Sequence, residues 1–246
     1  MPARRRDIGF AVAAGTVLAG YNNLLGALRW HRRRYVPVNA CATGAAVPAA
    51  VLAGLTPADL GLASGALPAG LRLGSAAAAA MAGGWLLTAA LPATRPVLRD
   101  QRAAGLSRRD VAYQALVRIP AGTVLWEETA FRGVLLAALR RVMPDTAAVA
   151  VASGVFGVWH IRPTIEALRV NRLAPGRGRA VAAVTAGCAA TAAGGAVLSW
   201  LRLRSASLAA PVLLHLAANC PALLAAWAFT RPGSLREPPG LRSAKM

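Results

Sequence analysis

The stretch LWEETAFRGVLL, residues 125–136, places two adjacent glutamates and an arginine in a run that is otherwise mostly apolar. The chain around it has 246 residues, of which 56% are hydrophobic and 15% are charged, and its mean hydropathy is +0.47. Soluble domains carry about 25% charged residues. So few charges, together with long apolar runs, indicate an integral membrane protein in which these polar side chains are removed from water.

Apolar runs extend on both sides of this stretch, and a membrane span needs roughly 20 mostly apolar residues. The sequence therefore predicts one all-α membrane domain over residues 1–246, a polytopic helical bundle with about seven spans. Segment 56–74, rich in Gly and Pro, is expected to be a loop or a re-entrant piece, and a re-entrant piece would raise the count to eight. The motif-bearing core of the domain is expected over about 112–230. Other expectations are a polar linker or interfacial helix at 97–111, a basic loop at 162–179 and a mobile tail at 231–246. The expected spans are 8–28, 36–55, 75–91, 112–139, 147–161, 180–201 and 207–229.

The charge balance is strongly basic, with 28 Lys and Arg against nine Asp and Glu and a net charge of +19. The basic residues form short clusters between the apolar runs, which is typical of cytoplasmic loops that face anionic lipid headgroups. We therefore expect membrane lipids as partners and no nucleic acid. Nearly all of this charge is arginine and the chain is rich in alanine, as in proteins of GC-rich bacteria, so we expect a multi-pass protein of the bacterial plasma membrane.

Ionisable residues are rare within the expected spans, and each is therefore a functional candidate. Among the nine acidic residues, only Glu127 and Glu128 lie in apolar runs, and His160 and His215 do so among the three histidines. His31 lies in the basic cluster RWHRRR and is expected at the surface. Helical spacing brings residues four apart onto one face, which pairs Glu128 with Arg132, Phe156 with His160, and His215 with Asn219.

These residues offer the parts of a hydrolytic site. Glu127 is left without the arginine, and a carboxylate beside a neutral imidazole can take a proton from water as a general base. A histidine with an asparagine amide can stabilise the oxyanion of a tetrahedral intermediate. Each part also has a structural interpretation: a buried ion pair, an interfacial histidine, or a hydrogen bond between helices. The catalytic interpretation depends on whether the three helices converge.

Three short stretches, EETAFR (127–132), FGVWH (156–160) and HLAAN (215–219), resemble the motifs EExxxR, FxxxH and HxxxN of the CaaX-protease and bacteriocin-processing family, also called CPBP or Abi. The resemblance implies an intramembrane endopeptidase with a cavity that opens to the membrane interface. It implies that Glu127 activates water with His160 as its partner, and that His215 and Asn219 form the oxyanion site. The resemblance gives supporting roles to Glu128 and Arg132, which orient the base, and to Phe156, which lines the cavity.

The resemblance leaves the cofactor and the substrate open. We favour a metal-free mechanism without a cofactor, because no HExxH motif is present and ligands spread over three helices have no spacing signature. A zinc ion held by Glu127, His160 and His215 is the alternative, and it excludes the oxyanion role of His215. The expected substrate is a hydrophobic or lipidated peptide. Two other functions remain, namely a non-catalytic membrane immunity or partner-binding protein and a proton-coupled transporter.

Overall fold

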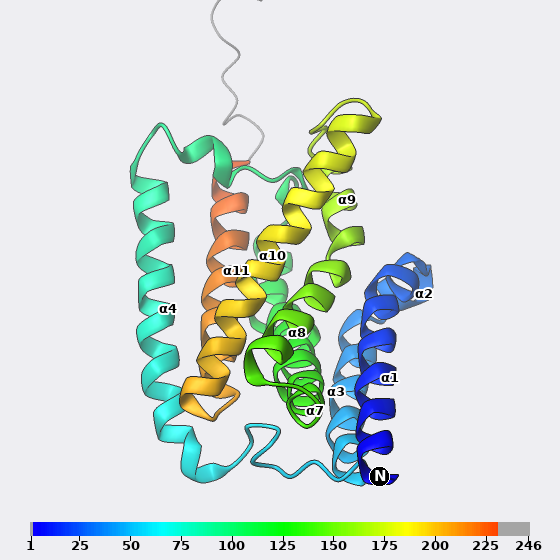
Figure 1. The fold of residues 1–246 in the computed structure, drawn as a ribbon. Helices are drawn as coiled ribbons and strands as arrows, with labels where there is room; N and C mark the ends of the chain where they lie inside the picture. The colour runs from blue at the N-terminus through cyan, green and yellow to red at the C-terminus, as the bar shows by residue number, and fades with distance from the viewer. Residues whose placement is uncertain (1, 231–246) are drawn as a thin grey trace, which may run out of the picture.

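The computed structural model describes residues 2–230, which form helices joined by short turns, and no strand occurs among them (Figure 1). The all-α fold class is thereby confirmed, while the tail 231–246 lies outside the described residues. The longer helices are α1 (Pro2–Leu24), α3 (Tyr35–Leu52), α4 (Leu67–Ala90), α8 (Asp145–Trp159), α9 (Ile161–Val170), α10 (Arg177–Ser205) and α11 (Ala209–Phe229).

Five helical segments of the described chain are long and apolar enough to cross a membrane. Only 6–17% of their most apolar windows is buried inside the protein, so apolar side chains cover their outer surfaces as lipid contact requires. The chain is thus a multi-pass membrane protein. The two remaining predicted runs, 112–139 and 147–161, do not meet this criterion, and the count of about seven spans stays a prediction. The five segments are Arg4–Ala27, Tyr35–Leu52, Ser64–Ala90, Arg177–Ser205 and Ala209–Phe229.

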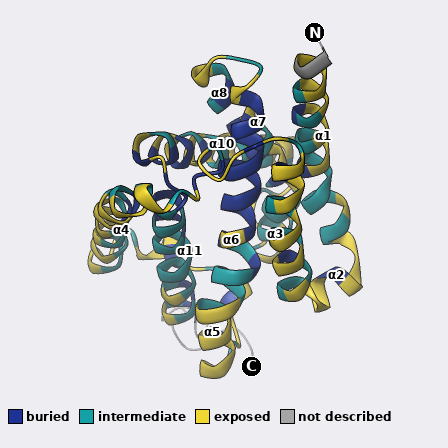
Figure 2. Ribbon diagram, turned by 90° about the horizontal axis from the view of Figure 1, so that it is seen from below, coloured by how far each residue is buried: buried dark blue, intermediate teal, exposed yellow. Residues whose placement is uncertain are grey.

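The buried centre of the bundle is one continuous helix over residues 108–140, in which α-helical and π-helical geometry alternate. Every residue from Trp126 to Leu139 is buried, and Figure 2 shows this part as a dark column between the other helices. A helix that is buried on all sides lies in the core of a protein, and residues 126–136 of the opening stretch are thereby shielded from both water and lipid. Its parts are α5 (Arg108–Tyr113), η5 (Gln114–Val124), α6 (Leu125–Glu127), η6 (Glu128–Leu135) and α7 (Leu136–Arg140).

Two predicted loops are helical in part. Segment 56–74 is irregular only at its start, because α4 already begins at Leu67. Pro68 lies in the first turn of α4, where the backbone N–H that proline lacks would have no partner within the helix. Segment 162–179 was predicted as a basic loop, but its first half belongs to α9. This helix is amphipathic, since Ile161, Ile165 and Leu168 share one face while arginines occupy another. The prediction relied on the arginine content of the segment and therefore missed the helix at its start.

Gly157 allows α8 to pack closely against α10. A Cβ atom on Gly157 would lie 2.7 Å from the backbone oxygen of Cys188 and 3.1 Å from the Cβ of Ala192, whereas a Cβ on Gly154 would meet nothing within 4 Å. We expect Gly157→Ala to lower the free energy of unfolding by about 1–3 kcal/mol through overpacking. Gly154→Ala, on the same helix, should leave it unchanged or raise it by up to about 1 kcal/mol. Unfolding of the purified variants in detergent measures both, and equal effects would contradict this account of the helix contact.

Candidate active site

Glu128 is the centre of a buried ion-pair cluster at the start of the π-helical turn η6. The Nη1 atom of Arg132 donates to its Oε1 at 3.1 Å, which confirms the pair predicted from the spacing of four. The Nδ1 atom of His215, on α11, lies 2.7 Å from the same oxygen. Glu128 and Arg132 are 0% and 1% exposed. Such hydrogen-bonded pairing offsets part of the cost of burying these charges.

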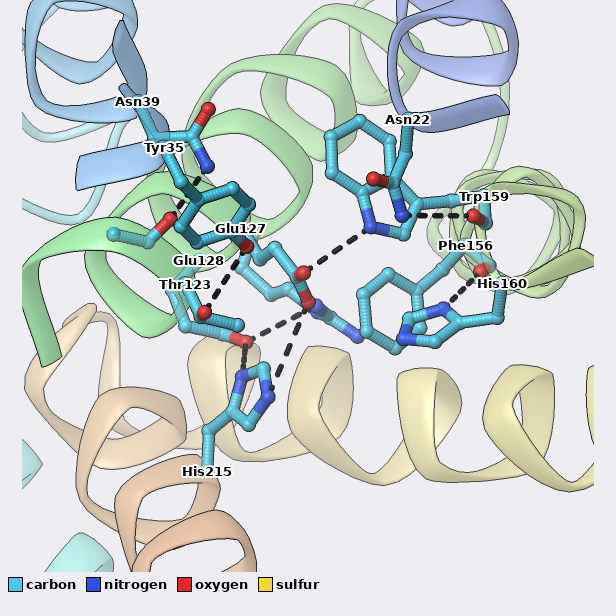
Figure 3. Close-up of polar contacts among 12 residues, drawn as sticks. Asn22, Tyr35, Asn39, Thr123, Glu127, Glu128, Phe156, Trp159, His160 and His215 are labelled. Atoms are coloured by element: carbon cyan, nitrogen blue, oxygen red, sulfur yellow. Dashed lines mark hydrogen bonds and ion pairs between the residues drawn. The ribbon is translucent and has the colours of Figure 1, made fainter. Parts of the chain in front are cut away.

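Glu127 makes different contacts, although it is adjacent to Glu128 in sequence. Its Oε1 accepts a hydrogen bond of 3.1 Å from the indole Nε1 of Trp159, at the end of α8. Its Oε2 has no hydrogen-bond partner among residues 2–230 and lies 4.0 Å from Nε2 of His215 (Figure 3). The carboxylate is thus held in place through one oxygen and has the other free for a small ligand such as water.

The two imidazoles approach this group from different helices, with the ring of Phe156 between them. The centre of the Phe156 ring is 4.5 Å from that of His160 and 6.5 Å from that of His215. The Nδ1 atom of His160 lies 2.8 Å from the backbone oxygen of Phe156. Because a carbonyl only accepts, Nδ1 carries the hydrogen, and Nε2 of the neutral ring is left as an acceptor. The guanidinium carbon of Arg132 lies 4.1 Å from the centre of the Phe156 ring, so this ring packs among the polar groups.

A cavity of about 360 Å³ joins the predicted residues. Glu127, His160 and Asn219 line it directly, while His215 is near it through its 4.0 Å approach to Glu127. The sequence stretches that carry these residues are far apart in the chain, and the fold brings them together as the catalytic interpretation requires. No hydrogen bond joins His160 to Glu127 directly in the described structure, so any link between them has to pass through a bound molecule.

The zinc alternative requires Glu127, His160 and His215 to converge on one point. No set of three or more His, Cys, Asp or Glu side chains within residues 2–230 is placed to hold a metal ion. The residues as placed do not fit a three-ligand metal site.

A second cavity, of about 500 Å³, adjoins the first and shares Arg102, Arg118, Glu166 and Asn219 with it. Apolar residues of the central helix and of α11, including Ile119 and Leu223, line this second cavity. The carboxylate and histidine therefore lie beside a space with both polar and apolar walls, as a site for an amphipathic peptide needs.

Two residues of the site were not predicted as functional. Trp159 fixes Glu127, and it stands inside the quoted FGVWH stretch, where its position next to His160 was the available signal. His31 was predicted at the surface, but it is 1% exposed and lines the smaller cavity. The prediction was wrong because the rings of Tyr21, Trp30 and Tyr35 pack around the imidazole, which its arginine neighbours do not reveal.

The electrostatic state of His31 follows from this packing. Burial lowers the pKa of His31, the nearby Asn39 amide opposes that change, and the positive charge of Arg118 lowers it further. The ring is therefore neutral at pH 7 and can donate or accept one hydrogen bond at each nitrogen according to its tautomer.

Two asparagines of α1 hold the break between α8 and α9, where His160 lies. The side chain of Asn22 donates to the backbone oxygen of Trp159 at 3.2 Å, and that of Asn23 donates to the oxygen of Val158 at 2.8 Å. The Asn23 side-chain oxygen also accepts from the backbone N–H of Arg162 at 3.1 Å. These bonds satisfy backbone groups exposed by the break and fix the position from which His160 projects.

Comparison with known proteins shows that the segment carrying this geometry is similar to one family. A family model described as type II CAAX prenyl endopeptidase Rce1-like matches residues 111–221. Searches of curated proteins and of solved structures found no match. The matched range holds all three motifs and every residue of the predicted site, in agreement with the CPBP resemblance. Residues 111–221 are therefore similar to the Rce1-like family of type II CAAX prenyl endopeptidases.

Proposed function

We propose that this protein is an intramembrane endopeptidase in which Glu127 activates the attacking water. The observation that carries the proposal is the free Oε2 of Glu127, which lies 4.0 Å from Nε2 of His215 at a cavity also lined by His160 and Asn219. A buried carboxylate oxygen without a partner is costly to maintain, which favours a role toward a bound water and substrate.

In the proposed reaction, Glu127 Oε2 takes one proton from the water. Nε2 of His160, an acceptor because its Nδ1–H bonds to the Phe156 carbonyl, accepts a hydrogen bond from the other hydrogen and orients the nucleophile. The water oxygen bonds to the carbonyl carbon of the substrate, and the electron pair of the C=O double bond moves onto its oxygen. When the C–N bond breaks, the proton held by Glu127 passes to the leaving nitrogen.

His215 and Asn219 would stabilise the oxyanion of that intermediate. In this role His215 donates a hydrogen bond from Nε2 while its Nδ1–H bonds to Glu128, which requires that the ring carries both protons. The Glu128 carboxylate, 2.7 Å from Nδ1, favours this cation. With His215 protonated, the two glutamates and the two cations, His215 and Arg132, sum to zero charge in a buried cluster. Such a fixed donor, backed by a carboxylate, is the arrangement that stabilises developing negative charge.

The proposed substrate is a membrane-associated or lipidated peptide in a bacterial plasma membrane. The family is named for prenyl endopeptidase activity, and apolar residues such as Ile119 and Leu223 line the cavity adjoining the site. A segment with a lipid or a hydrophobic stretch would place its apolar part there and its peptide bond beside Glu127.

The mechanism predicts that hydrolysis needs no metal. We expect purified protein in liposomes to cleave members of a fluorogenic lipidated-peptide library at a rate that EDTA and 1,10-phenanthroline leave unchanged. Loss of cleavage on chelation, restored by adding Zn²⁺, would refute the metal-free mechanism. Failure of this protein to cleave any member that a related CAAX endopeptidase cleaves would count against peptidase activity itself.

A further inference from the structure

Two hydroxyl groups meet at the wall of the cavity that contains Glu127. They belong to Tyr35 on α3 and to Thr123 on the π-helical part of the central helix, and both residues line the cavity. Their oxygens lie 3.1 Å apart, so the two side chains share a hydrogen bond (Figure 3). Neither residue belongs to the three motifs, and Tyr35 lies outside the range 111–221 that the family model matches. The proposed reaction uses neither hydroxyl.

This pair has one hydrogen more than its mutual bond uses. Because a phenol is more acidic than an alcohol, Tyr35 donates and Thr123 accepts. Within residues 2–230, Oγ1 of Thr123 makes no other hydrogen bond. The hydroxyl of Thr191, in contrast, bonds to the carbonyl of Gly187 one turn earlier at 3.1 Å, as threonines in helices commonly do. The hydrogen of Thr123 is therefore available to a molecule in the cavity, and the bond from Tyr35 polarises it as a donor.

Helix packing alone does not account for the pair. Asn39, four positions after Tyr35 on α3, already joins this helix to the central one, because it donates to the backbone oxygen of Gly122 at 2.6 Å and is 1% exposed. The ring of Tyr35 has contacts of its own. A Cβ on Gly122 would lie 3.1 Å from two of its carbons, and the guanidinium carbon of Arg118 lies 4.5 Å from its centre. The ring is thus fixed without its hydroxyl, which leaves the hydroxyl pair for a role toward the cavity.

The distance from Thr123 to Glu127 matches the repeat of an extended peptide. The two residues lie four positions apart on the central helix, on nearly the same face and at most about 6 Å apart along its axis. In an extended peptide, carbonyl groups that point to one side recur every second residue, about 6.6 Å apart. A peptide that lies along this helix with its cleaved bond beside Glu127 therefore places another carbonyl beside Thr123.

We propose that Thr123, oriented and polarised by Tyr35, donates its free hydrogen to a backbone carbonyl of the substrate two residues from the cleaved bond. This contact would fix the register of the peptide relative to Glu127. The inference rests on the proposed function and adds a substrate-binding residue to it.

Binding of modified peptides tests this contact without hydrolysis. The probe is a fluorescent, N-terminally lipidated heptapeptide, added to Glu127→Gln protein in phosphatidylcholine nanodiscs. In a series of such peptides, each peptide bond in turn is replaced by an (E)-alkene, which has no carbonyl oxygen. Mass spectrometry of the products formed by the unaltered protein locates the cleaved bond. The measured quantity is the loss of affinity that each replacement causes, with and without the hydroxyl of Thr123.

We expect the cost of one replacement, two residues from the cleaved bond, to depend on Thr123. With threonine it should weaken binding by about three- to tenfold, the usual strength of a neutral hydrogen bond. With Thr123→Val the unmodified peptide should already be weaker by that factor, and the same replacement should cost nothing more. Thr123→Ser should restore the dependence. Tyr35→Phe should cause a smaller loss, and none when added to Thr123→Val, because Tyr35 acts through Thr123.

Thr191→Val and Tyr113→Phe are the matched controls. Thr191 is also half-buried in a helix and Tyr113 is exposed, and neither lines either cavity, so both variants should bind every peptide as the parent does. Equal costs in Thr123 and Thr123→Val protein at every position would overturn the inference, even where peptides are cleaved. Dependence at the cleaved bond itself would also overturn it, because Thr123 would then contact the oxyanion. Dependence at one carbonyl without any hydrolysis would support the contact and refute the peptidase. Thermal unfolding of each variant confirms that it is folded.

Discussion

Glu127→Gln is expected to abolish peptide hydrolysis while the protein remains folded. Glutamine has the size of glutamate and its side-chain oxygen can still accept the hydrogen bond that Trp159 donates at 3.1 Å. Its amide cannot take a proton from water, so the general base is lost. Positioned bases contribute factors of about 10²–10⁴ to rate, and we expect the cleavage rate to fall by about 10³-fold or more with little change in the affinity for substrate.

The control is Asp145→Asn, which also replaces a carboxylate by an amide. Asp145 is an exposed residue that pairs with Arg140 at 2.8 Å and lines neither cavity, so its replacement should leave the rate unchanged. Thermal unfolding in detergent should be the same for both variants and the parent. Full activity in folded Glu127→Gln would refute the assigned base. A cellular phenotype that survives this change would point to a non-catalytic membrane protein, and proton flux in vesicles would point to a transporter.

The fold was predictable in class because its main signal is local. Long apolar runs predict membrane helices from composition alone, but the run 112–139 was predicted as one more span, and its place as the buried central helix was not predicted. The boundaries were less predictable. Proline and glycine in segment 56–74 indicated a loop, but Pro68 begins a helix, and the arginines of α9 obscured the apolar face of Ile161 and Ile165.

The composition of the site was predictable, but its contacts were not. Glu128 and Arg132 are four residues apart and their pairing follows from helix geometry. His215, in contrast, lies 87 residues beyond Glu128, and Trp159 lies 32 residues beyond Glu127. The packing of α8 and α11 against the central helix determines which carboxylate contacts Trp159 and which contacts His215. No local sequence pattern contains that information. The burial of His31 was missed for the same reason, since Tyr21 reaches it from α1.

Arg132→Met is expected to lower the free energy of unfolding more than any other single change in the ion-pair cluster. Arg132 and Glu128 are both almost fully buried, so removing the arginine leaves a carboxylate in the core with only His215 as its partner. Breaking a buried pair in this way costs about 3–5 kcal/mol. Methionine fills much of the same volume, which makes the lost charge, rather than a cavity, the main cause. Equilibrium unfolding of purified protein in mixed detergent micelles measures the loss.

Two comparison variants identify that cause. Asp145→Asn breaks an exposed pair and should cost no more than about 1 kcal/mol. Adding Glu128→Gln to Arg132→Met removes the buried carboxylate that has lost its arginine, so the double variant should recover part of the stability that the single variant lost. If the double variant were instead less stable by the sum of the two single losses, the charges of Glu128 and Arg132 would not be energetically coupled. The cluster would then position His215 without the neutralisation that we infer, and the proposed cationic His215 would lose its electrostatic basis.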